Sequence, residues 1–242
     1  MLNWKDDNTF SIDDILFTID TTPGSKRRLS EEGNFTLVKP KKYIDEYTDL
    51  TKEEFNHVIE LGMFQGGSIV FLDKLFSPKC LIGVEIVPTK LEALESYIEK
   101  ESRPIKTFYG SSQDDVSLLK NIVQDEMGGN LDLVVDDASH LYEQSKVSLT
   151  TLFPLLKPNG LYIIEDWAWS HRPNAQESSH VWFDKPALTN LVVELVAELG
   201  RTGEIDNIYI SNNMVKIRKA KNSISSPLFS KEAMRYRGLR GL

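Results

Sequence analysis

The amino-acid sequence predicts an α/β protein with a doubly wound, mostly parallel sheet of seven strands. Short runs of β-branched and aromatic residues recur between residues 57 and 166, each with the length of a strand buried on both faces. Amphipathic stretches of helical length separate these runs, which is the pattern of parallel βαβ units. Two alternating stretches near the C-terminus predict an antiparallel hairpin that completes the sheet.

Five apolar runs are the expected parallel strands, and the hairpin supplies the other two. In chain order the runs are HVIELG (57–62), CLIGVEI (80–86), IKTFYG (105–110), LDLVVDD (131–137) and GLYIIED (160–166). The expected helices cover about 66–76, 88–101, 112–127, 143–156 and 187–199. The hairpin is DNIYISNNMVKIRKA (206–220), which turns at Ser-Asn-Asn.

The two ends of the chain differ from this regular region, residues 51–221, which we expect to form the catalytic domain. Residues 1–50 include TTPGSKRRLSEEGN (21–34), which has turn and charge signals without periodicity. We therefore expect an N-terminal extension of short helices around a loop that could act as a lid. Residues 222–242 are basic and predict a loosely attached C-terminal tail.

Composition excludes several classes of function. The net charge of -8 argues against a protein that reads a nucleic-acid phosphate backbone. The single cysteine, Cys80, allows no internal disulfide, and we expect a buried structural thiol there. No run of about 18 apolar residues and no leader pattern occurs, so we expect a cytoplasmic protein without a membrane span.

A glycine-containing loop, ELGMFQGGS (60–68), follows the first expected strand. In doubly wound sheets, ligands bind at the carboxyl ends of the strands, and Gly62, Gly66 and Gly67 would let the backbone approach one. The spacing matches neither the dinucleotide fingerprint nor a P-loop, and a tight strand-to-helix turn is the alternative explanation. Glu85, at the end of the second strand, could accept hydrogen bonds from ribose hydroxyls.

Polar residues after the third strand add to this pattern. GSSQDD (110–115) places Ser112 and Gln113 where they could hold an adenine edge. Between residues 56 and 220, these motifs and the terminal hairpin resemble the S-adenosylmethionine site of the class I methyltransferases, which have a Rossmann-like fold. The resemblance implies S-adenosylmethionine as cofactor, bound by Glu60, Gly62, Gly66, Ser68, Glu85, Ser112, Gln113 and Asp136.

Carboxylates follow the fourth and fifth strands. LDLVVDDASH ends in Asp136, Asp137 and His140, and LYIIED ends in Glu165 and Asp166. Where the strand tips converge, three carboxylates would repel one another unless a cation lies between them, and oxygen ligands suit Mg²⁺ or Ca²⁺. Asp136 should face the other way because side chains alternate along a strand. The alternatives are that both aspartates cap the next helix and that His140 faces solvent.

The stretch DDASHLYEQ…LFPLLKPNGLYIIED resembles the metal-dependent sugar O-methyltransferases of macrolide tailoring, of the mycinamicin and macrocin type, and the related cephalosporin hydroxylase-like proteins. The resemblance implies that Asp137, Glu165 and Asp166 bind Mg²⁺ and that His140 is the catalytic base. Catechol-type O-methyltransferases use an Asp and an Asp-Asn pair with a lysine as base. The chain departs from them at His140 and Glu165, which favours an aliphatic hydroxyl as acceptor.

We therefore expect O-methyl transfer from S-adenosylmethionine to a sugar or a glycosylated or hydroxylated natural product. Aromatic residues after the fifth strand would line the acceptor pocket or pack on one another: Trp167, Trp169, His171, His180 and Trp182. The other hypotheses are a hydroxylase-like enzyme of different chemistry and a non-catalytic S-adenosylmethionine-binding protein. Relatives are often oligomeric, so the resemblance leaves a homo-oligomer open.

Overall fold

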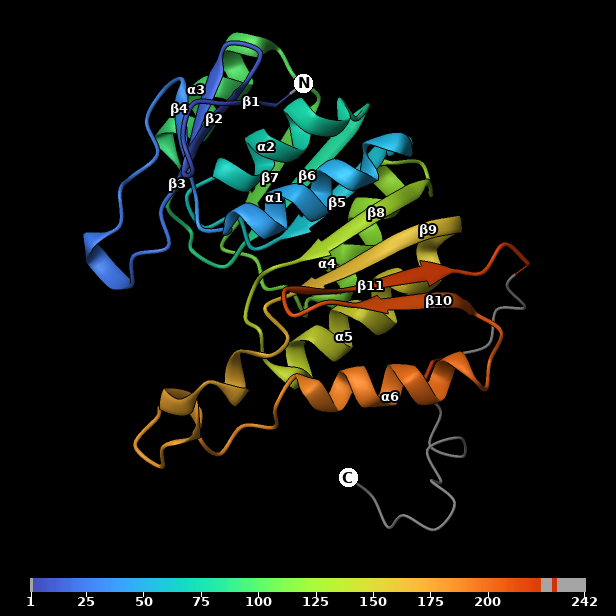
Figure 1. Cartoon of the computed structure of the whole chain (residues 1–242). Helices are drawn as coiled ribbons and strands as arrows, with labels where there is room; N and C mark the ends of the chain where they lie inside the picture. Colours follow the sequence, from blue (N-terminus) through green and yellow to red (C-terminus); the bar gives the residue numbers. More distant parts are fainter. Residues whose placement is uncertain (1, 223–227, 230–242) are drawn as a thin grey trace. The chain divides into compact units, whose positions relative to one another are not determined.

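The computed structural model describes residues 2–222, 228 and 229, so nearly all of the expected tail lies outside the described residues. The chain divides into two compact units, Met1–Ser112 and Gln113–Leu242. Strands β5 to β11 belong to one mostly parallel seven-stranded sheet, and a second sheet has four strands (Figure 1). The predicted sheet of seven strands is confirmed.

The first unit contributes three parallel strands of the large sheet, in the order β5-β6-β7. They are β5 (His57–Leu61), β6 (Cys80–Glu85) and β7 (Ile105–Tyr109), connected by α2 (Gly67–Phe76) and α3 (Glu92–Glu101). All lie within the expected ranges, and β5 and β6 are buried as predicted, whereas β7 lies at the edge of the sheet and buries only Ile105. Cys80 is only half-buried, against expectation, because it is the first residue of β6.

The N-terminal extension forms a small sheet, which the sequence analysis did not predict. Its strands are β1 (Asn3–Trp4), β2 (Thr9–Ile12), β3 (Ile15–Ile19) and β4 (Asn34–Leu37). The expectation of short helices is wrong for this part, because TFSIDDILFTI alternates buried and accessible residues about a turn. A helix does follow, α1 (Lys41–Thr48), and the segment 20–33 between β3 and β4 is largely irregular.

Aromatic side chains attach the small sheet to α2 within the first unit. The ring of Phe71 on α2 lies 6.0 Å from Phe10, 5.9 Å from Phe17 and 6.0 Å from Tyr47, in edge-to-face geometry. All four side chains are completely buried. Edge-to-face pairs stabilise a core beyond the area that they bury. The strands of the extension are therefore part of a packed core, and its predicted role as a lid stays a prediction.

The second unit contributes four strands of the large sheet, in the order β10-β11-β9-β8. They are β8 (Leu131–Asp136), β9 (Leu156–Glu165), β10 (Ile205–Ile210) and β11 (Met214–Lys219). β8 and β9 are parallel, β11 is antiparallel to β9, and β10 is antiparallel to β11. This confirms the predicted C-terminal hairpin and places its turn, 211–213, beside the end of β9, where Met214 pairs with Glu165.

Three helices belong to the second unit: α4 (Val116–Asn121), α5 (Tyr142–Leu152) and α6 (Thr189–Leu199). The helix expected at 112–127 starts later, because Asp115 caps it by accepting a hydrogen bond from the Leu118 N–H, and it ends in a π-helical turn, Ile122–Glu126. α5 and α6 lie side by side (Figure 1). The segment after β9 contains two short 3₁₀ helices, Trp169–His171 and Pro173–Gln176.

Candidate functional site

The second unit brings three titratable side chains together at the ends of two neighbouring strands. One ligand atom each from Asp137, His140 and Asp166 lies within 4.8 Å of the others. Asp137 directly follows β8 and Asp166 directly follows β9, and these strands are parallel and adjacent. The carboxyl ends of adjacent parallel strands meet at one edge, so the sheet itself creates this group.

The backbone at two of these residues adopts a conformation that side chains rarely allow. His140 has φ 54° and Asp166 has φ 50°, both in the left-handed region. The Asp166 N–H donates to the Asn213 carbonyl oxygen over 3.0 Å, and the Trp169 N–H donates to the Asp166 carbonyl oxygen over 3.2 Å. Non-glycine residues persist in such conformations where the surroundings fix them, as at functional sites.

The charges of this group fit a divalent cation. The His140 Nε2 lies 3.8 Å from Asp137 Oδ1, and these side chains are 25% and 23% exposed, so solvent and ligands can reach them. Arg172 Nη2 lies 3.9 Å from Asp166 Oδ1, in a long and exposed ion pair. Two carboxylates with an accessible face suit Mg²⁺, which keeps several waters and uses few protein carboxylates. An imidazole nitrogen as third ligand would favour a softer transition metal.

Glu165 is placed differently from its neighbour. It is the last residue of β9, its side chain is only 1% exposed, and the group of three does not include it. Consecutive residues at a strand end point to different sides, so Glu165 and Asp166 do not share one environment. Its role as a metal ligand stays a prediction.

Asp136 belongs to a buried hydrogen-bond network within the second unit. Its carboxylate accepts from Gln113 Nε2 at 3.0 Å, Ser148 Oγ at 2.9 Å and Tyr162 Oη at 3.2 Å. Burial raises the pKa of Asp136, and the hydrogen bond from Ser148 acts against that rise. Asp136 thus faces away from Asp137, as alternation along the strand predicts.

Gln113 connects this network to the loop that carries the site. Its Oε1 accepts a hydrogen bond from the Ser139 N–H at 2.8 Å, while Nε2 donates to Asp136. Both the oxygen and the nitrogen of the Gln113 amide are therefore engaged, and the hydrogen bond to Ser139 fixes the loop between Asp137 and His140. The contact of Gln113 with the adenine stays a prediction.

In the first unit, the glycines of the 60–68 loop form the tight turn considered above. Gly62 and Gly66 have φ 88° and 79°, and Phe64 between them has φ 49°. A side chain at Gly66 would place its Cβ 2.8 Å from Leu94 Cβ, and one at Gly67 would place it 2.1 Å from the Thr36 carbonyl oxygen. Glycine is required here for packing as well as for any approach of a ligand.

Glu85 closes the same turn from the end of β6. Its Oε2 accepts from the N–H groups of Met63 at 3.1 Å and Phe64 at 2.9 Å, and its Oε1 accepts from Val87 N–H at 2.9 Å. The side chain is 8% exposed. The turn thus fixes the carboxylate at the strand end. Of the other expected cofactor residues, Glu60 is completely buried, and Ser68 and Ser112 are half-buried.

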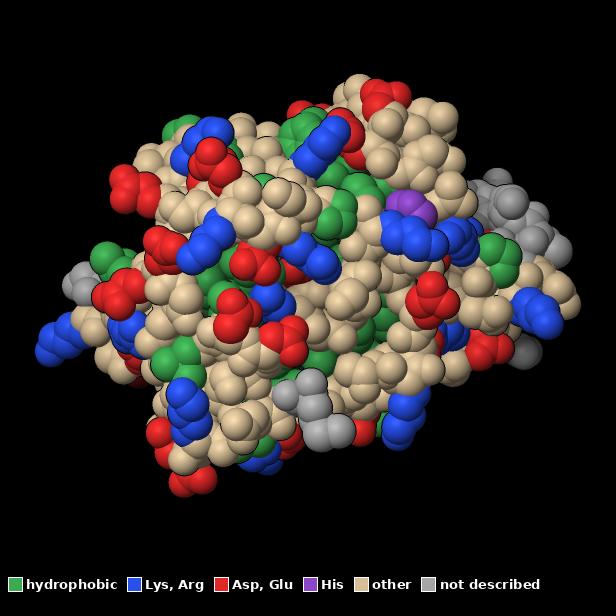
Figure 2. All heavy atoms as spheres, turned by 90° about the horizontal axis from the view of Figure 1, so that it is seen from above, with side chains coloured by type: hydrophobic (Ala, Val, Ile, Leu, Met, Phe, Trp, Pro, Cys, Tyr) green, Lys and Arg blue, Asp and Glu red, His purple; other side chains and the backbone are tan. Residues whose placement is uncertain are grey.

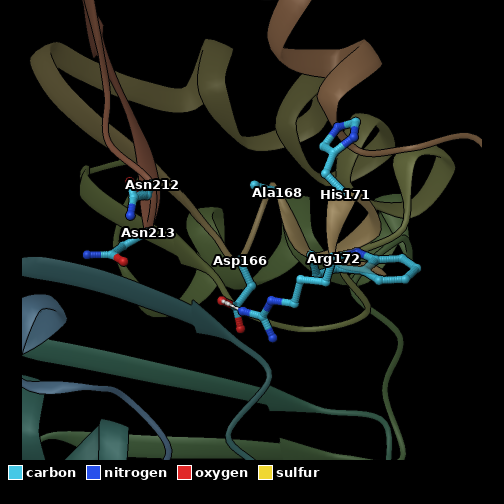
Figure 3. A pocket seen from close by; sticks show the side chains of 7 residues that line it. Asp166, Ala168, His171, Arg172, Asn212 and Asn213 are labelled. Atoms are coloured by element: carbon cyan, nitrogen blue, oxygen red, sulfur yellow. Dashed lines mark ion pairs between the residues drawn. The ribbon is translucent and has the colours of Figure 1, made fainter. Parts of the chain in front are cut away.

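The aromatic residues after β9 divide between self-packing and a pocket. The rings of Trp169, His180 and Trp182 lie 5.2 to 6.0 Å apart, and the Trp167 indole donates to the Ser211 carbonyl oxygen. A pocket of about 310 Å³ opens beside them (Figure 3). It is lined by Asp166, Ala168, Trp169, His171, Arg172, Asn212 and Asn213. Arg172, Asn212 and Asn213 were not predicted: the sequence signal of the two asparagines is that of a turn, and Arg172 lies among exposed polar residues without a motif.

Figure 2 shows acidic and basic side chains interspersed over the face in view, consistent with a net charge of -8. Among the helices that the structure describes, none is both long and apolar enough to cross a membrane.

The fold is that of the class I methyltransferases, with a seven-stranded sheet that ends in an antiparallel hairpin. Residues 59–167 match the family model described as a methyltransferase domain. The chain resembles the MycE methyltransferase from the mycinamycin biosynthetic pathway, solved with Mg and SAH, with a TM-score of 0.56 and 22% identity over 77% of this chain and 50% of that one.

Curated relatives carry the same likeness in sequence. The 8-demethyl-8-(2-methoxy-alpha-L-rhamnosyl)-tetracenomycin-C 3'-O-methyltransferase of Streptomyces olivaceus is 27% identical over 74% of this chain and 49% of its own. The demethylmacrocin O-methyltransferase of Streptomyces fradiae is 27% identical over 71% and 46%. The predicted resemblance to sugar O-methyltransferases of this type is confirmed, and the chain spans about half the length of these relatives.

Proposed function

We propose that the chain is an S-adenosylmethionine-dependent and metal-dependent O-methyltransferase, whose acceptor is a hydroxyl of a sugar or of a glycosylated or hydroxylated natural product. The observation that carries the proposal is the group of Asp137, His140 and Asp166 within 4.8 Å at the ends of β8 and β9. It occurs in a chain with the class I fold, and the proteins similar to this chain include relatives named as O-methyltransferases, such as the demethylmacrocin O-methyltransferase.

Asp137 and Asp166 would hold the metal ion, with Glu165 as the third ligand that the sequence predicts. The two carboxylates that the structure brings together supply the hard oxygen donors that Mg²⁺ prefers. When bound, such an ion supplies Lewis-acid chemistry that lowers the pKa of an acceptor hydroxyl. Without a cation these carboxylates repel each other, so binding of a cation would relieve this repulsion.

His140 would remove the proton from the acceptor hydroxyl. Its Nε2 lies 3.8 Å from Asp137 Oδ1, so the ring is close to the position at which the proposed ion would hold the hydroxyl. Its left-handed backbone conformation and its position just before α5 fix the direction in which the side chain leaves the main chain. A positioned base of this kind typically contributes a factor of about 10² to 10⁴.

The first unit would bind the methyl donor. Glu85 accepts from three backbone N–H groups, so its carboxylate is held at the end of β6, where the resemblance places the ribose contact. Gly62 and Gly66 let the loop after β5 adopt its left-handed turns and add no side chains of their own. Since the sulfonium methyl is already activated, the main contribution of the protein is to position donor and acceptor.

The test is incubation of the full chain with methyl-labelled S-adenosylmethionine and a panel of glycosides and hydroxylated natural products. We expect label in a methyl ether of the acceptor, loss of product in EDTA, and recovery on addition of Mg²⁺. A variant of an exposed carboxylate in the same unit, Asp184→Asn, should keep the metal response of the wild type. Cofactor binding without product across the panel would favour a non-catalytic binding protein instead.

The assembly state is a separate part of the proposal. The resemblance leaves a homo-oligomer open, and multi-angle light scattering of the full chain would determine the number of copies.

A further inference from the structure

We propose that the pocket beside Asp166 binds a single sugar ring that carries hydroxyls and no amino group, and that Arg172 and Asn212 determine this specificity. The inference rests on the proposed function, because it assigns the acceptor subsite of that reaction. Neither residue belongs to the group that would hold the metal or remove the proton.

Three segments of the second unit build the pocket. Asp166 and Ala168 follow β9, Trp169 to Arg172 form the next turn, and Asn212 with Asn213 lies at the turn of the β10–β11 hairpin. Figure 3 shows Arg172 reaching toward Asp166, with the two asparagines on the opposite side of Asp166. The volume of about 310 Å³ is at the lower end for small-molecule pockets. It therefore suits one ring and leaves any larger attached group outside.

The lining has the hydrogen-bonding capacity of a polyol site. An asparagine amide both donates and accepts, and so does each hydroxyl of a sugar, while the guanidinium of Arg172 only donates. Trp169 supplies apolar ring surface, since its Nε1 is already engaged with the His140 carbonyl oxygen. A ring with several hydroxyls and an apolar face matches these groups.

The wall of the pocket is fixed before a ligand arrives. The Trp167 indole donates to the Ser211 carbonyl oxygen at 2.8 Å, and the Asp166 N–H donates to the Asn213 carbonyl oxygen at 3.0 Å. These two bonds tie the hairpin turn to the segment after β9. Groups held in this way lose little freedom on binding, which favours affinity and selectivity.

The positive charge of Arg172 would disfavour amino sugars, whose protonated amine is also positive. The Arg172–Asp166 ion pair is long, at 3.9 Å, and the Arg172 side chain is 68% exposed, so the guanidinium can turn to a ligand at little cost. A divalent cation at Asp137 and Asp166 would take up the charge of Asp166, so that Arg172 becomes the charged group of the pocket lining that faces a ligand. A protonated amine would then meet a like charge, whereas a hydroxyl would accept a hydrogen bond.

The experiment measures binding rather than turnover. Methyl glycosides of several neutral monosaccharides are titrated into the full chain with Mg²⁺ and S-adenosylhomocysteine, by saturation-transfer NMR. Each is compared with its amino-for-hydroxyl counterpart at a pH at which the amine is protonated. We expect at least one neutral glycoside to bind, its amino counterpart to bind about 5-fold more weakly or worse, and Asn212→Ala to weaken the neutral ligand by about 3- to 10-fold.

Arg172→Gln should remove the discrimination, so that the neutral and amino glycosides bind within about 2-fold of each other. The matched controls are Lys185→Gln and Asn174→Ala, at exposed residues of the segment after β9 that do not line the pocket. Both should bind like the wild type. The proposal is overturned if no neutral glycoside binds, if the amino counterpart binds equally well, or if Arg172→Gln and Asn212→Ala match their controls.

Calorimetry with S-adenosylhomocysteine and with Mg²⁺ on the same samples separates this inference from the proposed function. Normal binding of both, with glycoside binding unaffected by the pocket variants, would overturn the subsite alone. A chain that binds neither would overturn the proposed function, and with it the role of Arg172, which depends on a bound cation.

Discussion

The indole Nε1 of Trp169 donates a hydrogen bond to the backbone carbonyl oxygen of His140 over 2.8 Å. The Trp169 N–H donates in turn to the carbonyl oxygen of Asp166, so one residue contacts both left-handed positions of the candidate site. Trp169 also lines the pocket beside them. The segment after β9 is thereby attached to the loop that carries the proposed base.

Trp169→Phe tests this attachment, because it keeps an aromatic ring and removes the donor. We expect kcat to fall about 10-fold or more through misplacement of His140, and stability to fall by about 1 kcal/mol. Affinity for S-adenosylmethionine should not change. The control is Trp182→Phe in the same aromatic cluster. Equal kcat in the two variants would show that the bond does not position the site.

The network around Asp136 predicts a pH dependence of stability. Burial raises the pKa of Asp136, so the folded protein binds this proton more tightly than the unfolded chain, whose pKa is about 3.9. The resulting stability is fully present below that value and is lost as the pH rises through the folded pKa. Asp136→Asn cannot ionise, so it should gain stability relative to the wild type over this window. Parallel stability profiles of the two proteins in urea unfolding would contradict the assignment.

The proposed metal site can be tested by removing the charge of each of its three carboxylates in turn. Asp137→Asn and Asp166→Asn should each weaken Mn²⁺ binding, measured by electron paramagnetic resonance, by about 10-fold or more, since each removes a charged ligand. Glu165→Gln decides whether the third ligand that the sequence predicts takes part. The control Asp184→Asn should bind like the wild type. Unchanged affinity in Asp137→Asn would contradict a metal at this position.

Glu85 is predicted to support both the fold and the cofactor. Because its carboxylate accepts from three backbone N–H groups, Glu85→Ala should reduce the free energy of unfolding by about 1 to 3 kcal/mol. It should also weaken S-adenosylmethionine binding by about 1.5 to 3 kcal/mol. Glu92→Ala, at an exposed position of α3, is the control. A loss of stability with unchanged affinity in calorimetry would restrict Glu85 to the turn.

Much of the large sheet could be predicted because its inner strands β5, β6, β8 and β9 contain buried apolar runs that helices separate along the chain. The small N-terminal sheet was missed, because TFSIDDILFTI alternates over few residues beside a charged turn. Its burial depends on Phe71 of α2, which lies far away in the sequence.

The candidate site was predictable only in part, for a similar reason. Asp137 and Asp166 follow neighbouring parallel strands, so topology alone brings them together. Arg172 and Asn212 enter the pocket because the hairpin turn packs beside the segment after β9, a tertiary contact with no local signal. Gln113 was noticed as a polar group, but its bond to the Ser139 N–H depends on how two loops meet.

Turnover of His140→Ala tests the central claim most directly, in an assay with labelled S-adenosylmethionine, Mg²⁺ and an accepted glycoside. If His140 removes the acceptor proton, kcat should fall by about 10² to 10⁴ and recover partly at high pH, while affinities for the metal and the cofactor stay unchanged. Wild-type turnover in His140→Ala, or full activity of the wild type in EDTA, would show that the cluster is structural and that the proposed mechanism is wrong.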